Sequence, residues 1–551
     1  MCGIFSILNN CYDSTFVEKA FKKSSKRGPE NSTIIFNNEY NLILGFHRLA
    51  INGFNNPKSE QPLNLQNCQL ICNGEIYNWK ELHKLCGSPN ISGSDCEIII
   101  HLYKKYGIEY TLQLLDGVFA FILYDSTKKE LYVARDTYGI RPLFIGFNNT
   151  FSIIFSSEIK SIVPFEKYSN FTINQFNPGT YSRFKYKDKK WDIDIHNSIF
   201  SKPNSFVNNT IKILDTCAII VRNSLVEAVK KRIVNTDRPI ACLLSGGLDS
   251  SLIAALVKKF STNCDLHTWS IGFEGSDDLK YAQIVADHIG STHHSIVCKE
   301  EDFLNAIPEV IYHIESYDTT TVRASVGNWL ISKYIRENSN AKVIFNGDGS
   351  DELTGGYMYF HHAPNEIEFD KECRRLLGDI HYFDVLRSDR SISSNGLEAR
   401  TPFLDRNFVQ TYLSLPYKFR FHPSEKKCEK FLLRTAFINE QNKECTNSLL
   451  PKEILWRTKE AFSDGVSSQK KSWFEVIQEH LEKTYTPKDK NYEKYKNPPT
   501  TLEQKYYRDL YELYFNGKNV IPYFWMPKFI KATDASARTL NIYNEKKNYK
   551  K

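Results

Sequence analysis

The sequence predicts two domains: a strand-rich α+β domain at the N-terminus and an α/β domain with a parallel sheet after it. Its 551 residues exceed what one hydrophobic core usually supports. Short apolar runs between turn residues fill the first third of the chain. Beyond about residue 214, short apolar runs alternate with helical periodicity, a pattern typical of a parallel sheet flanked by helices.

The strands of the N-terminal domain are predicted from runs with alternating or continuous apolar character. These runs cover residues 42–46, 69–72, 118–124, 131–134 and 151–155. The stretch from Lys187 to Asn209 is polar and has no periodicity, which is typical of a connecting segment. We therefore place the first domain at residues 1–190 and a linker at residues 191–213.

The second domain is predicted to span residues 214–530. Apolar residues recur every four positions from Val221 to Ile233, which indicates a helix starting at about Asp215. Residues 239–244 suit a buried strand, and another helical segment follows from Leu252. Residues 531–551 include a run rich in lysine and asparagine, which predicts a basic, solvated tail.

Composition excludes several classes of protein. The hydrophobic content of 41% and charged content of 25% are ordinary for a soluble globular protein. No apolar run reaches the roughly eighteen residues of a membrane span, and residues 1–7 lack the features of a signal peptide. A net charge of +7 is mild, and 13 cysteines without a CxxC pair argue against disulfides and a zinc ribbon. We expect a cytoplasmic protein that binds neither nucleic acid nor membranes.

Residues near the N-terminus could form a glutaminase site. Removal of Met1 would place the Cys2 thiol beside an α-amino group with a pKa of about 8, so one residue would supply nucleophile and base. Alone, such a cysteine is more often structural. One guanidinium and two carboxylates, from Arg48, Glu75 and Asp95, complement a zwitterionic amino acid. Singly, these three residues suit a surface ion pair, a solvated face and a helix N-cap.

The Asn73 side chain and the Gly74 N–H could stabilise the oxyanion that forms when a thiolate attacks a carboxamide. The combined motifs resemble the class II glutamine amidotransferases. They are Met1-Cys2-Gly3-Ile4, Arg27-Gly28-Pro29, His47-Arg48-Leu49-Ala50-Ile51, Asn73-Gly74-Glu75-Ile76-Tyr77-Asn78 and Ser94-Asp95-Cys96-Glu97.

The resemblance implies an N-terminal-nucleophile fold, with stacked antiparallel sheets between helices. It also implies that Cys2 forms a glutamyl thioester and releases ammonia, with Asn73 and Gly74 as further catalytic residues. The implied glutamine-binding residues are Arg48, Leu49, Ala50, Ile51, Asn52, Asn73, Gly74, Glu75 and Asp95.

The second domain carries an anion-binding loop. Ser245-Gly246-Gly247-Leu248-Asp249-Ser250 follows the predicted strand, and its glycines allow backbone N–H groups to approach a polyphosphate at a helix N-terminus. The chain has no Walker ending, and an acidic Asp249 in such a loop makes sense if a metal bridges it to phosphate. A second cluster, residues 346–352, could supply another magnesium ligand, although alone it could be a polar turn.

The loop and the cluster resemble the ATP-pyrophosphatase domain of adenylating synthetases, a fold similar to the adenine nucleotide hydrolases. Joined to a glutaminase domain in this order, they resemble the asparagine synthetase family up to about residue 525. Residues 315–325, 396–405 and 459–466 add to the likeness. The implied ATP-binding residues are Leu244, Ser245, Gly246, Gly247, Asp249, Ser250, Ile271, Asn346 and Gly347. Asp249 and Asp351 are the implied Mg²⁺ ligands, and Asp348 and Lys459 are implied to be catalytic.

One position departs from the family pattern. The family usually has glutamate where this chain has Asp348, and aspartate is one methylene shorter. Misplacing a catalytic group by about 1 Å can slow a reaction on the order of a hundredfold. The resemblance implies glutamine, aspartate and ATP as substrates, an internal ammonia tunnel between the sites, and a homodimer.

Three alternatives remain open at this point. A related amidotransferase or cyclising synthetase, such as a β-lactam synthetase-like enzyme, would use the same folds. An RNA-modifying enzyme could share the pyrophosphatase loop, although the chain shows no concentrated basic face. A non-catalytic scaffold is hinted at only by the substitution at Asp348.

Overall fold

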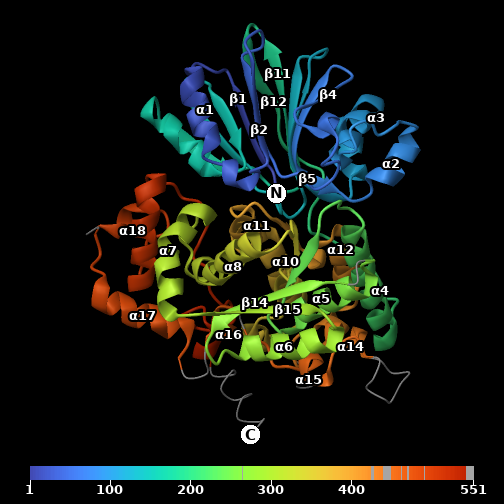
Figure 1. Ribbon diagram of the computed structural model, residues 1–551, viewed down its shortest axis with the longest axis vertical. Coiled ribbons are helices and arrows are strands. Elements are labelled where there is room, and N and C mark those ends of the chain that lie inside the picture. Colours follow the sequence, from blue (N-terminus) through green and yellow to red (C-terminus); the bar gives the residue numbers. More distant parts are fainter. Residues whose placement is uncertain are drawn as a thin grey trace.

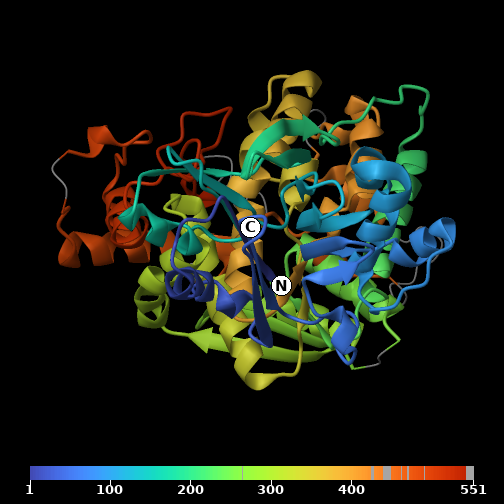
Figure 2. The same ribbon diagram turned by 90° about the horizontal axis from the view of Figure 1, so that it is seen from above.

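The computed structural model describes residues 1–262, 265–423, 427–438, 448–460, 462–467, 471–488 and 491–540. Two domains lie one above the other, with the N-terminal domain at the top of Figure 1. The N-terminus lies at their junction, where the α-amino group of Met1 donates a hydrogen bond to the Leu397 carbonyl at 2.9 Å. Seen from above, helices α17 and α18, coloured red, lie at one side of the molecule (Figure 2).

The N-terminal domain is a sandwich of two six-stranded antiparallel sheets, with strand orders β10-β8-β9-β1-β3-β2 and β12-β11-β7-β6-β5-β4. Its elements are β1 (Gly3–Leu8), α1 (Ser14–Lys22), β2 (Asn31–Asn37), β3 (Leu42–Arg48), β4 (Leu63–Leu65), β5 (Cys68–Ile76), α2 (Trp79–Cys86), α3 (Ile98–Leu114), β6 (Gly117–Asp125), β7 (Glu130–Arg135), β8 (Phe144–Asn148), β9 (Ile153–Ser156), β10 (Phe171–Gln175), β11 (Thr180–Lys187) and β12 (Lys190–Ile199).

Strand β6 explains why this part of the sequence is almost continuously apolar. Phe119, Phe121 and Leu123 pack against helices α2 and α3, whereas Ala120 and Ile122 enter the core between the two sheets. Because successive side chains of a strand point to opposite faces, both faces of β6 are buried. The predicted stacked antiparallel sheets are confirmed.

The C-terminal domain is built on a five-stranded parallel sheet with the order β15-β14-β13-β16-β17. Its elements are α4 (Leu214–Ile233), β13 (Ile240–Leu243), α5 (Leu248–Phe260), β14 (His267–Phe273), α6 (Asp277–Ile289), β15 (Thr292–Cys298), α7 (Glu300–Ile314), α8 (Thr319–Asn338), β16 (Val343–Phe345), α9 (Ser350–Thr354), α10 (Glu366–Asp379), α11 (Asp384–Ser393), β17 (Glu398–Arg400), α12 (Arg406–Ser414), α13 (Tyr417–Arg420), α14 (Phe431–Ala436), α15 (Lys452–Leu455), α16 (Phe462–Gly465), α17 (Trp473–Thr484) and α18 (Leu502–Phe515).

The strand order places a switch point between β13 and β16. The chain passes from β13 outward through β14 to β15, then returns to the other side of β13 with β16 and β17. In open parallel sheets, ligands bind outside the carboxyl ends of the strands at such a point. The loops after β13 and β16 are those predicted to bind the nucleotide.

Three boundaries differ from the sequence-based predictions. Residues 191–199, assigned to the linker, form most of β12, which pairs with β11. Helix α5 begins at Leu248, not Leu252, because the glycine turn ends at Gly247. Residues 531–540, assigned to a solvated tail, pack on the domain: Asp534 pairs with Arg323, and Leu540 is 7% exposed. Residues 541–551 of that tail lie outside the described residues.

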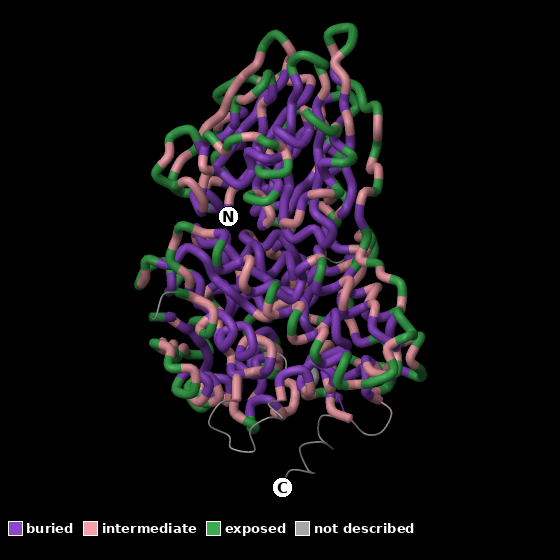
Figure 3. Tube along the Cα trace, turned by 90° about the vertical axis from the view of Figure 1, so that its right-hand side faces the viewer, coloured by how far each residue is buried: buried purple, intermediate pink, exposed green. Residues whose placement is uncertain are grey.

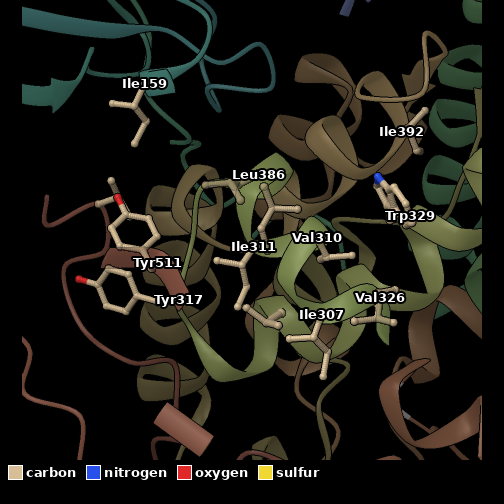
Figure 4. Close-up of a cluster of buried hydrophobic side chains, with 14 of the residues drawn as sticks. Ile159, Ile307, Val310, Ile311, Tyr317, Val326, Trp329, Leu386, Ile392 and Tyr511 are labelled. Carbon is tan, nitrogen blue, oxygen red and sulfur yellow. The ribbon is translucent and has the colours of Figure 1, made fainter. Parts of the chain in front are cut away.

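An apolar cluster crosses the junction between the domains. Ile159 of the N-terminal domain belongs to the same buried cluster as Ile311, Leu386 and Tyr511 of the C-terminal domain, and Figure 4 shows it above their helices. The buried trace in Figure 3 likewise continues from one domain into the other. Among the described helices, none combines the length and apolar character of a membrane span.

Candidate active sites

The Cys2 thiol lies where β1 begins, beside the end of β3. Strands β1 and β3 are antiparallel and pair Gly3 with His47, which places the residue before Gly3 next to the segment after His47. The Cys2 sulfur is 3.4 Å from both the backbone nitrogen and the carbonyl oxygen of Leu49. The Arg27 Nε donates to the Cys2 carbonyl at 2.9 Å, which fixes the backbone of the predicted nucleophile.

Met1 fills a buried position at the domain junction. It is 1% exposed, and its sulfur contacts the Arg141 guanidinium. Burial lowers the pKa of its α-amino group to about 5 and raises the pKa of the Cys2 thiol to about 11. With Met1 in place, the Cys2 thiol is therefore protonated at neutral pH. The nearby neutral amine is then the α-amino group of Met1, not that of Cys2.

Asn73 on β5 has a buried side-chain amide without a hydrogen-bond partner within the described residues. It is 1% exposed, and neither its side-chain nitrogen nor its oxygen has a hydrogen-bond partner within the described residues. An unpartnered buried polar group costs about 1–3 kcal/mol, so an amide of this kind is expected where a ligand completes the hydrogen bonds. At Gly74, a Cβ would lie 2.5 Å from the Val118 carbonyl, and only glycine fits this register.

Asn52 brings the two predicted carboxylates together. Its side-chain nitrogen donates to Glu75 at 2.8 Å and to Asp95 at 3.3 Å. The helix-cap alternative for Asp95 is wrong: Ser94 caps the following turn, and Asp95 accepts a 2.6 Å bond from the Ile76 N–H. Burial raises the pKa of Asp95 to about 6 and the pKa of Glu75 well above its ordinary value.

Arg48 lies at the open side of this group. Its guanidinium donates to the Gly53 carbonyl at 3.3 Å and to the Ser59 hydroxyl. Within the described ranges it has no carboxylate partner, so its charge is free for a substrate carboxylate. Leu49, Ala50 and Ile51 are buried, and the Ala50 N–H donates to Glu30 at 2.7 Å, which holds the chain on this side of the site.

The second site is formed by the loops that follow β13 and β16. Leu244 donates its N–H to the Trp269 carbonyl at 2.8 Å, and the hydroxyls of Ser245 and Ser250 lie 3.0 Å apart. Gly246 has a φ of +69°, and a Cβ there would lie 2.5 Å from the backbone nitrogen of Ala282.

The two loops touch each other: a Cβ on Gly347 would lie 2.8 Å from the Asp249 Cβ. The close approach explains why glycine is needed at this position. The backbones of the loops can therefore enclose a small anion from both sides.

Two lysines neutralise the carboxylates of this site. The Lys430 Nζ is 2.6 Å from both the Asp249 Oδ2 and the Asp351 Oδ1, and the Lys459 Nζ is 2.6 Å from the Asp351 Oδ2. Although burial opposes ionisation, Lys430 and Lys459 lower the pKa of Asp351 to about 2. The loop after β13 therefore faces fixed positive charge across the cavity.

Asp348 lies in an adjacent group of charges. The Arg387 Nη2 donates to Asp348 at 3.1 Å and to Asp384 at 2.5 Å. The Tyr357 hydroxyl bridges Asp384 at 3.0 Å and Glu352. Burial raises the pKa of Asp348, and its Oδ2 lacks a hydrogen bond within the described chain. An acceptor therefore points into this side of the site.

Most of the predicted nucleotide residues line one cavity of about 180 Å³. Its walls include Leu244, Ser245, Gly247, Asp249, Ser250, Ile271, Asn346, Gly347, Asp348, Asp351 and Lys459, whereas Gly246 is not among them. A larger cavity of about 820 Å³ is lined by residues of β8, β10 and β12 together with residues 519–522, and contains no predicted site residue. We assign the chemistry to the smaller cavity because charged groups converge only there among these two.

The carboxylates of Asp249 and Asp351 fit a divalent cation. The Lys430 ammonium already lies between them, so the geometry places positive charge at the point that both oxygens face. Carboxylate oxygens are also the donors that Mg²⁺ prefers. Sequence reasoning missed Lys430, Arg387 and Tyr357; Lys430 follows a charge-rich run whose composition is typical of a solvated surface.

A thiol site on an antiparallel sandwich and an anion loop at the switch point of a parallel sheet define a two-domain amidotransferase. A glutamine amidotransferase domain model matches residues 1–207, and an asparagine synthase model matches residues 220–371 and 363–518. The chain belongs to the glutamine-hydrolysing asparagine synthetase family.

Two relatives illustrate the extent of the match. Asparagine synthetase (glutamine-hydrolyzing) of Gallus gallus is 41% identical over 573 aligned residues, which cover 98% of this chain and 99% of that protein. The Homo sapiens enzyme is 41% identical over 570 residues with the same coverage. Among solved structures, a glutamine PRPP amidotransferase from B. subtilis is 17% identical, covers 63% of this chain and 81% of that one, and has a TM-score of 0.30.

Proposed function

We propose that this protein converts L-aspartate, L-glutamine, ATP and water to L-asparagine, L-glutamate, AMP and diphosphate. The proposal rests on one combined observation. The chain matches its family over 98% of its length, and both candidate sites contain a buried polar group that has no hydrogen-bond partner within the described residues. These groups are the Asn73 side-chain amide in the first site and the Asp348 Oδ2 in the second.

In the first half-reaction, removal of Met1 frees the Cys2 α-amino group, which takes the thiol proton. The sulfur attacks the glutamine carboxamide carbon, and the α-ammonium group of Cys2 returns the proton to the departing nitrogen, which leaves as ammonia. Water then hydrolyses the thioester to glutamate and the free thiol. The Asn73 amide and the Gly74 N–H donate to the oxyanion. Arg48 binds the α-carboxylate, and Glu75 and Asp95 bind the α-ammonium group, whose positive charge favours their ionised forms.

In the second half-reaction, a β-carboxylate oxygen of aspartate attacks the α-phosphorus of ATP, and diphosphate leaves. Ammonia then attacks the β-carbonyl carbon of the aspartyl-adenylate, and AMP leaves. Backbone N–H groups of residues 245–250 hold the phosphates, and Lys430 and Lys459 neutralise the charge of the departing diphosphate. Asp249 and Asp351 would hold Mg²⁺, which supplies further neutralisation when bound.

Asp348 accepts a proton from the attacking ammonia or orients it, with Arg387 holding the carboxylate. The finer assignments rest on the family resemblance. They are Mg²⁺ as the metal, a cytoplasmic location, a homodimer, and an internal path for ammonia between the two sites.

The test is to incubate the purified protein with glutamine, aspartate and Mg-ATP, and to measure asparagine, glutamate, AMP and diphosphate. We expect equal amounts of asparagine, AMP and diphosphate. Cys2→Ala should abolish the use of glutamine but leave synthesis from ammonia intact, because only the first half-reaction needs the thiol. Loss of both activities in Cys2→Ala, or no AMP from the unchanged protein, would overturn the proposal.

A further inference from the structure

The connection between α4 and β13 belongs to the C-terminal domain but contacts the glutamine site. The connection runs from Val234 to Pro239, and we call its residues 235–238 the α4–β13 connector. The Asn235 side-chain nitrogen donates to Glu75 at 2.9 Å, and its oxygen accepts from Trp79 at 2.7 Å. One carboxylate of the glutamine site is thus held by an amide of the other domain.

The connector also fixes the segment that carries Ala50, Ile51 and Gly53. The Asp237 N–H donates to the Ile51 carbonyl at 3.0 Å, and the Asp237 carboxylate accepts from the Gly53 N–H at 2.8 Å. This pair of bonds holds the chain from two sides. Residues 51–53 and the connector are therefore joined by two hydrogen bonds across the junction between the domains.

Arg238 adds a third attachment to the same segment. It donates to the Ala50 carbonyl at 3.0 Å and pairs with Glu30 at 2.9 Å. Glu30 in turn accepts the Ala50 N–H at 2.7 Å. The Ala50 carbonyl is therefore bonded to Arg238 directly, and the Ala50 N–H is bonded to Glu30, which Arg238 holds in place.

Arg400 on β17 clamps the connector from the side of the nucleotide site. It is 1% exposed, it donates to the Asn235 carbonyl at 2.8 Å, and it lies 3.2 Å from the Glu75 carboxylate. Its own carbonyl accepts the N–H of Asn346 at 3.1 Å, at the start of the second nucleotide loop. Arg400 therefore contacts both sites.

The other end of the connector leads directly to the first nucleotide loop. Pro239 and the four residues of β13 separate it from Leu244 and the loop at residues 245–250. The seven residue steps from Arg238 to Ser245 would span roughly 23 Å if they were fully extended. Strand β13 is hydrogen-bonded on both sides, to β14 and β16, which makes it stiff. A displacement of the connector at one end of β13 is therefore transmitted to the nucleotide loop at the other end.

We propose that the α4–β13 connector is part of the glutamine site and couples glutamine binding to occupation of the nucleotide site. Asn235, Asp237 and Arg238 are positioning residues: they hold Glu75 and residues 50–53 and touch no reacting atom. The inference rests on the proposed function, because it assigns glutamine to the first site and ATP to the second. Coupling of this kind is reciprocal for binding affinities.

The test uses the full-length protein with Asp237→Asn and Arg238→Met. Matched controls are Asp215→Asn and Lys230→Met, which change an exposed residue and a partly exposed residue of α4. Glutaminase kcat and KM are measured with and without Mg-ATP and aspartate, and ammonia-dependent synthesis is measured for each variant. Arg238→Lys tests rescue by a side chain that keeps the charge.

In the unchanged protein, we expect Mg-ATP with aspartate to change the glutamine KM. That change should be at least about fivefold, the lower end of the range for coupled sites, and each connector variant should raise the KM measured with nucleotide present. The ratio of KM values with and without nucleotide should move to one, while ammonia-dependent synthesis stays within about twofold and thereby shows that the variants are folded. Arg238→Lys should recover part of the KM.

An unchanged glutamine KM in both variants, or a ratio that stays at its original value, overturns the inference. So does a ratio of one in the unchanged protein. Failure of the proposed function looks different, because the unchanged protein would then lack glutaminase activity or AMP formation altogether.

Discussion

Replacing Lys430 by methionine tests how the nucleotide site is charged. The Lys430 side chain is 1% exposed and lies 2.6 Å from a carboxylate oxygen of both Asp249 and Asp351. The pKa of Asp351 falls to about 2, against about 3.9 for a free aspartate, and each pKa unit corresponds to about 1.4 kcal/mol. Lys430 and Lys459 together therefore offset burial and still favour the charged carboxylate, by roughly 2–3 kcal/mol.

Methionine keeps the length of the side chain but leaves two partly buried carboxylates facing each other. Breaking a buried ion pair from one side costs about 3–5 kcal/mol, and we expect a loss of about 3 kcal/mol in the free energy of unfolding at pH 7. Since the folded pKa of Asp351 is lowered, its stabilisation is complete above about pH 4 and lost as the pH falls through about 2. The difference between variant and unchanged protein should therefore shrink below pH 4.

The assay is urea unfolding with and without saturating Mg²⁺. A divalent cation between the carboxylates should stabilise Lys430→Met more than the unchanged protein, because it replaces the missing ammonium. The control is Lys371→Met, which removes a lysine from an exposed pair with Glu368 and should cost about 0–1 kcal/mol. If Lys430→Met loses no more than the control, or if Mg²⁺ stabilises both proteins equally, the charge argument is wrong.

Three further predictions concern single groups. Because burial raises the pKa of Asp95 to about 6, the glutamine KM should rise as the pH falls through 6, and Asp95→Asn should weaken that pH dependence and leave the part due to Glu75, whose pKa is also raised by burial. Asp348→Glu should raise the rate of asparagine formation, by up to about a hundredfold, whereas Asp348→Asn should lower it; unchanged rates in both would dismiss Asp348 as a reacting group. Gly74→Ala should cost about 1–3 kcal/mol in urea unfolding and lower glutaminase activity, because its Cβ meets the Val118 carbonyl; a fully active, stable variant would contradict this.

The strands and the charged residues of the first site could be predicted because they leave local signals. β6 alternates between two apolar environments and is therefore apolar throughout, and Asn73 and Gly74 stand out as polar or bare positions on the neighbouring strand. The start of α5 could not be placed as well, since Gly246 and Gly247 fit either a longer turn or an early helix start. Such boundaries depend on tertiary contacts.

Lys430 and Arg387, two of the groups that sequence reasoning missed, share one property: each contacts a carboxylate that is distant in the sequence. Lys430 contacts Asp249 across 181 residues, and Arg387 contacts Asp348 across 39. In the sequence each is one charged residue among many, and a solvated position is the ordinary expectation for it. Only the fold brings these charges into one cavity.

The domain junction extends this reasoning to the thiol site itself. Arg27 is fully buried, donates to the Cys2 carbonyl at 2.9 Å, and balances its charge on Asp389 of the other domain at 2.8 Å. Arg141 lies 3.4 Å from Glu398 in the same region. An N-terminal domain without its partner would keep Glu158, 3.6 Å from Arg27, but lose Asp389, the nearer of the two carboxylates. The backbone of Cys2, the proposed nucleophile, is therefore held in part by charge from the C-terminal domain, so both candidate sites depend on one junction.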